Sequence, residues 1–360
     1  MPDTEGIRTA GDVAHLMRGA RNAVKTCLSV TENDEVTIVC DEASRTVAAA
    51  LRLAVLEGKA RCNCFILERH IPRPADRLPP LIRRALTRST VSIYTCRPID
   101  GETGHRLELI SLVEPHRLRH AHMINVTDDA MQQGMLSDYR HVARLNDLMV
   151  ERLGRAATIR VTSRRGTAVT VVLDRAEPWE RSAGVIAPGQ WHNLPNGEIY
   201  TCPGSVDGVF ICDGVVPITL QLDRFEIGRH PLRLEFRAGR LIDAAGGPGD
   251  LARHVLANVR EGRNLDRIGM FAVGTNFDLL MPIGNATQDL FVPGAYFSLG
   301  RSPATGGHPA SWSSSAQYPF TARKTSLLLD GVAVIHEGRY DPVLLAEAAP
   351  PRTYPPASPA

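Results

Sequence analysis

The stretch QWHNLPNGEIYTCPG, residues 190–204, combines a turn, a histidine, two aromatic side chains and a carboxylate. LPNG at 194–197 predicts a tight turn, because proline presets φ and the Asn-Gly pair tolerates positive φ. Residues 198–201 then alternate like a strand, which Pro-Gly at 203–204 ends. Glu198 therefore follows a rigid turn directly, a position suited to a metal ligand or a general base. The other interpretation is a surface carboxylate on a hairpin strand.

The chain on the C-terminal side of Gly154 is rich in short strand patterns separated by Gly, Pro and Asp. Such a run predicts a β-rich second domain with few helices. The predicted strands are 157–163, 168–174, 208–213, 218–222, 232–236 and 241–244, and a helix is predicted at 250–261.

The chain before Gly154 alternates apolar strands with amphipathic helices, which predicts parallel βαβ units. The predicted strands are 35–41, 62–67, 91–95 and 121–125, and the predicted helices are 9–29, 44–57, 78–88, 106–113 and 138–153. The fold class is therefore α/β, with an N-terminal doubly wound, mostly parallel sheet and a β-rich α+β second domain that carries a cleft. Ligands in such sheets bind beyond the carboxyl ends of the strands, near Asp41 and Arg97. No GxGxxG or P-loop follows the first strand, so the sequence does not support a nucleotide site.

The domain boundaries follow from the same patterns. We predict an α/β domain at residues 1–153, a β-rich domain with the active-site cleft at 154–347, and a disordered Pro/Ala-rich tail at 348–360.

Composition excludes several classes of protein. The chain has 360 residues, 43% hydrophobic and 22% charged, which is ordinary for a globular protein. Its net charge of +2 indicates neither a nucleic-acid partner nor a membrane partner. The seven cysteines are odd in number and partly lie in apolar runs, which argues against a disulfide framework. No run of about 18 apolar residues or N-terminal signal region is found, so we expect a cytoplasmic protein.

Several motifs of the second half resemble a known family. NLPNGEIYTCP (193–203) is followed by LRLEFRAGRLID (232–243), FAVGTN (271–276), GAYFSLG (294–300) and TSLLLDG (325–331). Together they resemble the aminopeptidase T-type thermophilic metallo-aminopeptidases and the 2,5-dihydroxypyridine 5,6-dioxygenases, which share one scaffold. The resemblance implies a metal site in the second domain, at an inter-domain cleft, and a homodimer.

The resemblance also implies which positions would bind the metal. The first ligand, a glutamate, is retained as Glu198. The remaining ligand positions carry Met270, Tyr296, Gln317 and Pro319 in place of histidine and carboxylate. These side chains are poor ligands for zinc, cobalt or ferrous iron, and proline offers none. We therefore expect no metal and no other cofactor.

Polar and aromatic residues near the inherited cleft form the candidate site. The predicted catalytic residues are Glu198, His308, Tyr296 and His192. The predicted substrate-binding residues are Trp191, Tyr200, Asn276, Trp312 and Gln317. His192 with Glu198 would be a base and its orienting partner, although His192 bonding its own turn is an alternative, as is an exposed loop position for His308. A metal site at His116, His120 and His122 is not favoured, since they span a loop and a strand entry.

Three functions remain open from the sequence. The favoured one is a metal-independent tailoring enzyme, or a binder, for a peptide, an amino-acid-derived or an aromatic molecule in specialised, natural-product metabolism. The second is a metal-dependent aminopeptidase, as in a leucyl aminopeptidase homologue, or a ring-cleaving dioxygenase with a rearranged site. The third is a pseudoenzyme, a non-catalytic partner that presents a peptide. Binding clefts and metal-free active sites use the same residue types, so the pattern does not choose between them.

Overall fold

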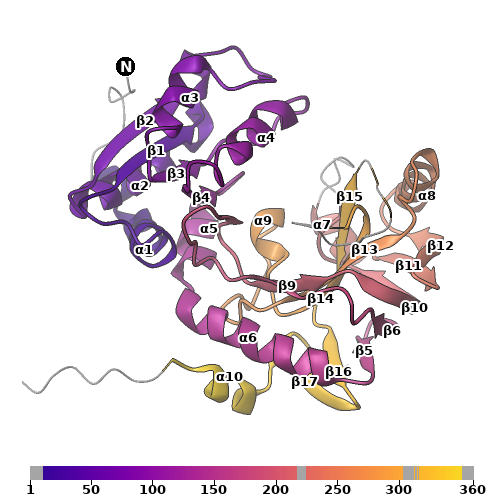
Figure 1. Cartoon of the computed structure of the whole chain (residues 1–360). Helices are drawn as coiled ribbons and strands as arrows, with labels where there is room; N and C mark the ends of the chain where they lie inside the picture. The colour runs from indigo at the N-terminus through magenta and orange to yellow at the C-terminus, as the bar shows by residue number, and fades with distance from the viewer. Residues whose placement is uncertain (1–10, 217–223, 303–311, 313, 315, 351–360) are drawn as a thin grey trace, which may run out of the picture.

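The computed structural model describes residues 11–216, 224–302, 312, 314 and 316–350. Two lobes are joined by the long helix α6 (Tyr139–Arg155), which runs beneath the second lobe (Figure 1). One lobe carries a parallel sheet and the other carries antiparallel sheets. The predicted α/β class with a β-rich second part is therefore confirmed.

The first lobe is built on a sheet in which, among the described residues, five strands run parallel in the order β2-β1-β3-β4-β8. Its strands are nearly continuous apolar runs because helices cover both faces. The strands are β1 (Glu35–Cys40), β2 (Arg61–Ile66), β3 (Val91–Tyr94), β4 (Arg119–His122) and β8 (Trp191–Asn193).

Two groups of helices sandwich this sheet. One face packs against η1 (Gly11–Leu16), α1 (Met17–Asn22), η2 (Ala23–Cys27) and α2 (Arg45–Glu57), with α5 (Asp128–Gln132) and η5 (Gly134–Leu136) alongside. The opposite face packs against α3 (Pro80–Leu86) and α4 (Thr103–Ser111). Short turns η3 (Glu42–Ser44) and η4 (Leu67–Arg69) follow β1 and β2.

The second lobe stacks two antiparallel sheets. In the described chain the larger sheet has the order β12-β11-β10-β6-β5-β16-β17-β18 and the smaller one β15-β14-β13-β9-β7. The larger sheet comprises β5 (Ile159–Thr162), β6 (Ala168–Leu173), β10 (Pro203–Cys212), β11 (Leu232–Arg237), β12 (Arg240–Gly246), β16 (Ser326–Leu329), β17 (Val332–His336) and β18 (Arg339–Tyr340). The smaller comprises β7 (Glu180–Ser182), β9 (Glu198–Thr201), β13 (Ile268–Gly274), β14 (Gly294–Gly300) and β15 (Gln317–Thr321). Helices α7 (Arg224–Arg229), α8 (Leu251–Glu261), α9 (Ala286–Asp289) and α10 (Pro342–Ala348) complete the lobe.

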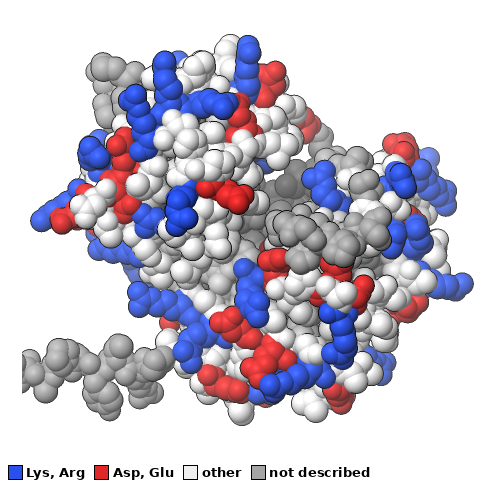
Figure 2. Space-filling view, viewed as in Figure 1, with Lys and Arg blue, Asp and Glu red and all other residues white. Residues whose placement is uncertain are grey.

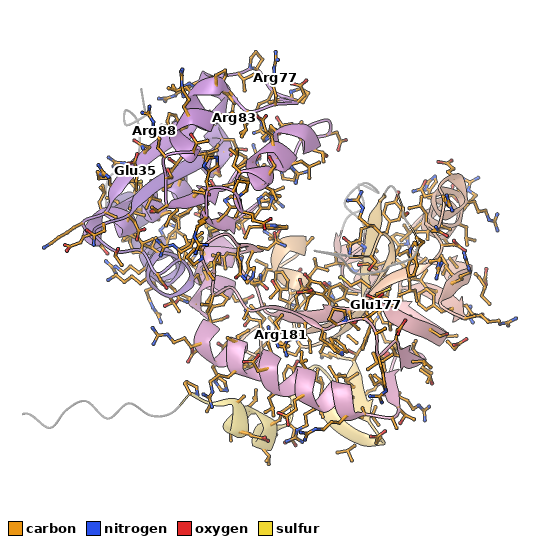
Figure 3. All side chains as sticks on the ribbon, viewed as in Figure 1. Glu35, Arg77, Arg83, Arg88, Glu177 and Arg181 are labelled. Atoms are coloured by element: carbon orange, nitrogen blue, oxygen red, sulfur yellow. The ribbon has the colours of Figure 1, made fainter. Side chains whose placement is uncertain are left out.

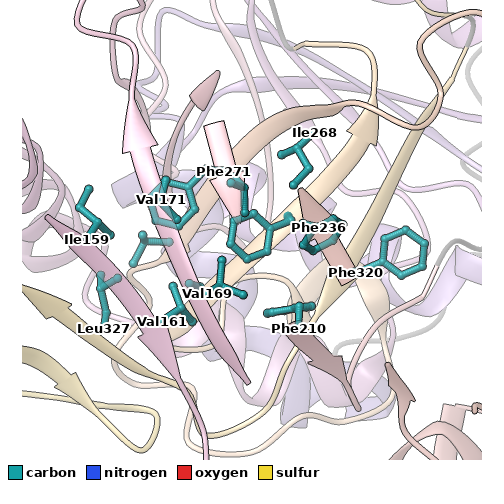
Figure 4. Close-up of a cluster of buried hydrophobic side chains, with 14 of the residues drawn as sticks. Ile159, Val161, Val169, Val171, Phe210, Phe236, Ile268, Phe271, Phe320 and Leu327 are labelled. Atoms are coloured by element: carbon teal, nitrogen blue, oxygen red, sulfur yellow. The ribbon is translucent and has the colours of Figure 1, made fainter. Parts of the chain in front are cut away.

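The two faces of the smaller sheet differ in chemistry. Phe271 of β13 and Phe297 of β14 lie in the main core. The larger sheet also lines this core, with Val169 and Phe210 near Phe271 (Figure 4). Because side chains alternate along a strand, Ala272 and Tyr296 lie on the opposite face, in a small separate cluster. That second face carries the candidate site.

Charged residues of both signs lie on the face of the molecule seen in Figure 2. Lys and Arg are interspersed with Asp and Glu over the visible face (Figure 2). Arg77, Arg83 and Arg88 lie around α3, while Glu177 and Arg181 lie on the second lobe (Figure 3). No helix in the described part of the chain is long and apolar enough to cross a membrane.

Some predictions differ from the structure. Strand β8 belongs to the first sheet, although the predicted boundary after residue 153 assigns it to the second domain. Short strands with weak patterns were missed, as were β13 to β15. The predicted strand 218–222 lies outside the described residues. Of the predicted disordered tail, Ala348 ends α10, and residues 351–360 are not described.

Candidate functional site

A hydrogen-bonded hub fixes the turn before Glu198. Gly197 has φ of 138° and lies so close to Asn276 that a Cβ at this glycine would come within 2.7 Å of the Asn276 Cβ. Asn276 donates from Nδ2 to the Asn196 carbonyl at 2.8 Å and accepts from Ser137 Oγ at 2.7 Å. Its side chain is fully buried. Asn276, predicted to bind substrate, therefore holds the turn in place in this structure.

Helix α6 supports the same strand from below. Asn146 donates from Nδ2 to the backbone carbonyl of Glu198 at 3.0 Å, and its Oδ1 accepts from Thr275 Oγ1. Asp138 begins this helix, and its carboxylate accepts from the backbone amides of Arg140 and His141. The position of Glu198 is thus set by elements from both lobes.

The Glu198 side chain is buried on the second face of the smaller sheet, where its Oε2 accepts a hydrogen bond from the Tyr296 hydroxyl. Burial raises the pKa of Glu198 to about 7, and the Tyr296 hydrogen bond opposes part of that rise. Burial and the Glu198 charge in turn raise the pKa of Tyr296 well above its ordinary value. Tyr200 lies two residues along β9 on the same face, and its pKa is raised by burial and by Glu198. A carboxyl group that titrates near neutrality can exchange protons at working pH.

The remaining positions implied by the resemblance lie on this face as well. Gln317 approaches the Met270 sulfur with its Nε2 at 3.5 Å, and Pro319 pairs with Ser298 in the sheet. The strand register therefore places Met270, Gln317 and Pro319 on the same face of the sheet as Tyr296. Neither thioether, amide nor phenol matches the imidazole and carboxylate set that zinc or ferrous iron requires. Among the described residues, no group of three or more His, Cys, Asp or Glu side chains could hold a metal ion.

Two pockets flank this face, and Leu290 lines both. The junction pocket, of about 370 Å³, is lined by Ile124 and Asn193 of the first lobe and by α9, Gln317 and Tyr318 of the second. The Tyr296 pocket, of about 270 Å³, is lined by Tyr296 and by segments 280–282, 321–324 and 337–339. Glu198 lines neither. Both pockets are large enough for a small organic molecule or part of one.

The other predicted residues lie apart from Glu198. The predicted His192–Glu198 pair is not formed, because His192 lies in the first sheet and its Nδ1 is buried without a hydrogen-bond partner in the described structure. Burial lowers the pKa of His192 to about 4. Trp191 is 40% exposed and meets His122 edge-on. Trp312 donates to the Gly300 carbonyl at 3.2 Å. His308 lies outside the described residues.

The histidine cluster of the first lobe also takes a defined form. His120 Nε2 contacts His122 Nδ1 at 3.3 Å, and His120 Nδ1 contacts Ser92 Oγ at 2.8 Å, while His116 is exposed elsewhere. Burial and the charge of Arg106 lower the pKa of His122 to about 3. Both imidazoles are packed in the sheet, where burial favours their neutral forms.

Sequence reasoning missed Asn146 and Leu290, which orient or line the site. Nothing in their local sequence distinguishes them, because each reaches the site only through the long-range packing of α6 or of the segment after α9. Asn193 begins the family motif at 193–203 but was not assigned a role at the site.

Comparison with known proteins completes this description. A family model described as 2,5-dihydroxypyridine 5,6-dioxygenase matches residues 15–261. The 2,5-dihydroxypyridine dioxygenase structure from Pseudomonas putida KT2440 superposes with a TM-score of 0.64 at 18% identity, covering 91% of this chain and 97% of that one. Wild-type AmpT from Thermus thermophilus superposes with a TM-score of 0.65 at 11% identity, covering 91% and 99%. At these identities the two structures establish a common fold alone.

Curated protein sequences gave no match. The family model nevertheless spans more than half of the 360 residues, from the first helices of the parallel lobe to the end of α8. It includes Glu198 and the turn that positions it. The chain therefore belongs to the 2,5-dihydroxypyridine 5,6-dioxygenase family.

Proposed function

We propose that this protein is a metal-independent acid–base enzyme that acts on a small aromatic, amino-acid-derived or peptide molecule in the cleft of an inherited scaffold. The observation that carries the proposal is the buried Glu198–Tyr296 pair, with a Glu198 pKa of about 7. Buried carboxyl groups with such raised pKa values are typical of proton-transfer sites.

The geometry suggests how the two groups divide the work. Tyr296 lines a pocket and Glu198 does not. Tyr296 would take a proton from the bound molecule while passing its own hydroxyl proton to ionised Glu198. The reverse transfer, from protonated Glu198 through Tyr296, would return a proton to the product. When Glu198 is protonated and Tyr296 keeps its hydroxyl proton, the pair carries no charge. A neutral pair costs less free energy to bury than a charged one.

The absence of a metal step follows from the donor set. On this face of the sheet the described residues offer Met270, Gln317, Tyr296 and Pro319, which do not form the ligand set of a hydrolytic zinc or an oxygen-activating iron. The proposal therefore assigns neither peptide hydrolysis at a metal nor dioxygen chemistry to this chain. The similarity to the dioxygenase and AmpT structures supports a shared fold only.

The test is turnover of a mixed panel of aromatic amino acids, their derivatives and dipeptides by chelator-treated protein, followed by mass spectrometry. We expect conversion without added metal, and loss of about a hundredfold or more in kcat for Glu198→Gln, as for other general acid–base groups. Glu151→Gln is the matched control, because Glu151 is an exposed carboxylate on α6. Activity that appears only when iron or zinc is added, or that survives Glu198→Gln in full, contradicts the proposal.

A second function, a non-catalytic binding protein, is favoured by one observation. Glu198 itself lines neither pocket, so a ligand can occupy both without touching the carboxyl group. Calorimetry on the same panel distinguishes the two functions. A binder would retain each ligand unchanged, whereas the enzyme would convert it.

A further inference from the structure

The Tyr296 pocket has walls of two kinds. It is formed by Gly214 and by four segments that are distant in sequence, at 280–282, 289–296, 321–324 and 337–339. Its basic side belongs to the turn after β15 and to the start of β18. Its apolar side belongs to the segment that leads into α9 and the residues that follow this helix.

The basic side carries three cationic side chains. Arg323, Lys324 and Arg339 line the pocket, and none of them forms an ion pair with another described residue. The Nε of Arg323 is buried and has no hydrogen-bond partner within the described chain. A buried guanidinium nitrogen without a partner is costly, so an acceptor supplied by a ligand would stabilise it.

The two carboxylates of the pocket are already engaged. Glu337 forms an ion pair with Arg164, which follows strand β5 of the larger sheet. Asp289 accepts from the backbone amides of Ile283 and Gly284 at 2.9 and 2.8 Å. The charge that remains available to a ligand is therefore positive.

The apolar side is unusually exposed for its residue types. Leu280 is 65% exposed and Met281 is 68% exposed, and Leu290 and Val292 continue this wall towards Tyr296. Large apolar side chains beside unpaired cations match a ligand that has an apolar body and an anionic head.

We propose that this pocket binds a small organic carboxylate, with the carboxylate at Lys324 and Arg339 and its apolar body against Leu280 and Met281. Taken with the proposed function, on which this further step rests, the substrate of the Glu198–Tyr296 pair is an aromatic or aliphatic acid. Binding of the carboxylate in the pocket does not itself depend on catalysis.

The experiment compares two probes of the same shape, phenylacetate and its neutral amide, phenylacetamide, by isothermal titration calorimetry on the full chain. We expect phenylacetate to bind at one site, at least about tenfold more tightly than the amide, because only the acid meets the cations. The double variant Lys324→Gln/Arg339→Gln should weaken phenylacetate binding by about tenfold or more and leave the amide unchanged. Both side chains are exposed, so the fold should tolerate the change.

Two further variants make the result specific. Arg237→Gln removes an exposed cation from β11, outside the pocket, and should bind phenylacetate as the wild type does. Glu337→Gln removes a negative charge from the lining and should strengthen phenylacetate binding. Equal affinity for acid and amide, no phenylacetate binding, or an unchanged double variant would overturn the proposal.

Failure of the proposed function gives a different pattern. Glu198 does not line the pocket, so Glu198→Gln should still bind phenylacetate with wild-type affinity. Retained binding together with unaffected turnover in Glu198→Gln would reject the acid–base pair and leave the carboxylate site standing.

Discussion

The buried carboxyl groups of the two lobes have opposite electrostatic environments. In the first lobe, Asp41 and Glu102 are both 1% exposed and surround the guanidinium of Arg73, whose own side chain is 6% exposed. In the second lobe, Glu198 is also buried, at 8% exposed, and among the described residues its carboxyl group has one hydrogen-bond partner, the Tyr296 hydroxyl. Asp41 and Glu102 keep lowered pKa values despite burial, because several hydrogen bonds oppose it. Burial instead dominates at Glu198 and raises its pKa.

The difference shows how one chain separates stability from chemistry. Arg73 lies beyond the carboxyl ends of β1 and β3, between which the strand order reverses, the place where α/β sheets usually bind ligands. The Arg73 side chain occupies that crevice, where it forms ion pairs with Asp41 and Glu102. It also donates a hydrogen bond to the Arg97 carbonyl. The sequence placed Asp41 and Arg97 in this crevice as a ligand position. The structure gives them a structural role and leaves an uncompensated carboxyl in the other lobe.

The largest effect should come from breaking the ion network. Arg73→Met leaves two buried carboxylates unpaired, which should lower the free energy of unfolding by about 3–5 kcal/mol. Arg83→Met is the control, since the exposed Arg83–Glu108 pair should be worth less than about 1 kcal/mol. Urea denaturation at neutral pH measures both. A loss as small for Arg73 as for Arg83 would show that the network is not needed for stability.

Removing the Glu198 carboxyl group should raise the free energy of unfolding, whereas removing Arg73 should lower it. A carboxyl whose folded pKa is about 7, against an ordinary 4.5, favours the folded state below pH 4.5 and loses that contribution as pH rises through 7. Glu198→Gln should therefore stabilise the protein by up to about 3 kcal/mol at pH 8 and by far less at pH 5. Asp41→Asn should instead destabilise most at high pH, because its lowered pKa contributes stability that is lost only on acidification.

Denaturation curves at pH 5 and pH 8 test the contrast. A Glu198→Gln protein that is less stable than the wild type at pH 8 would mean that Glu198 is compensated in the way Asp41 is. The acid–base proposal would then lose its central observation.

The sequence predicts structural features that depend on neighbouring residues better than features that depend on residues far apart in the chain. The buried runs of β1 to β3 and the amphipathic helices between them are local patterns, and they gave the first sheet correctly. The turn before Glu198 was likewise predicted from LPNG. Strand β8 was not, because its few residues pair with β4 only after the chain has crossed to the other lobe.

For the same reason, the sequence could not predict which residues pair with the buried charged side chains. Arg73 meets Glu102 from far along the chain, and Tyr296 meets Glu198 only through the register of β13 between their strands. The family motifs brought Glu198, Tyr296 and Met270 to one site in the alignment. The motifs alone could not show which carboxyl would remain charged, since that depends on the donors around it.

Tyr296→Phe should sharpen the comparison with a smaller effect. The Tyr296 hydroxyl is the donor that holds the Glu198 pKa down against burial, so its removal should raise that pKa by about one unit, the value of one hydrogen bond. The protonated carboxyl of Glu198 can be followed by infrared spectroscopy across a pH titration. Glu198→Gln identifies its band. An unchanged titration would show that Tyr296 is not the partner that sets the pKa.

The smallest expected effect is that of metal removal, because neither group of buried carboxyls depends on a metal charge. In the first lobe, Asp41 and Glu102 both form ion pairs with Arg73, and in the second lobe Glu198 is neutral at acidic pH. Elemental mass spectrometry after exposure to zinc, cobalt and ferrous iron should find no stoichiometric metal. Chelation should leave the melting temperature unchanged within about 1 °C, since a metal that binds only the folded state would raise it. A stoichiometric metal together with a fall in melting temperature would require ligands beyond the described residues, such as His308, and would turn Glu198 from a proton carrier into a ligand.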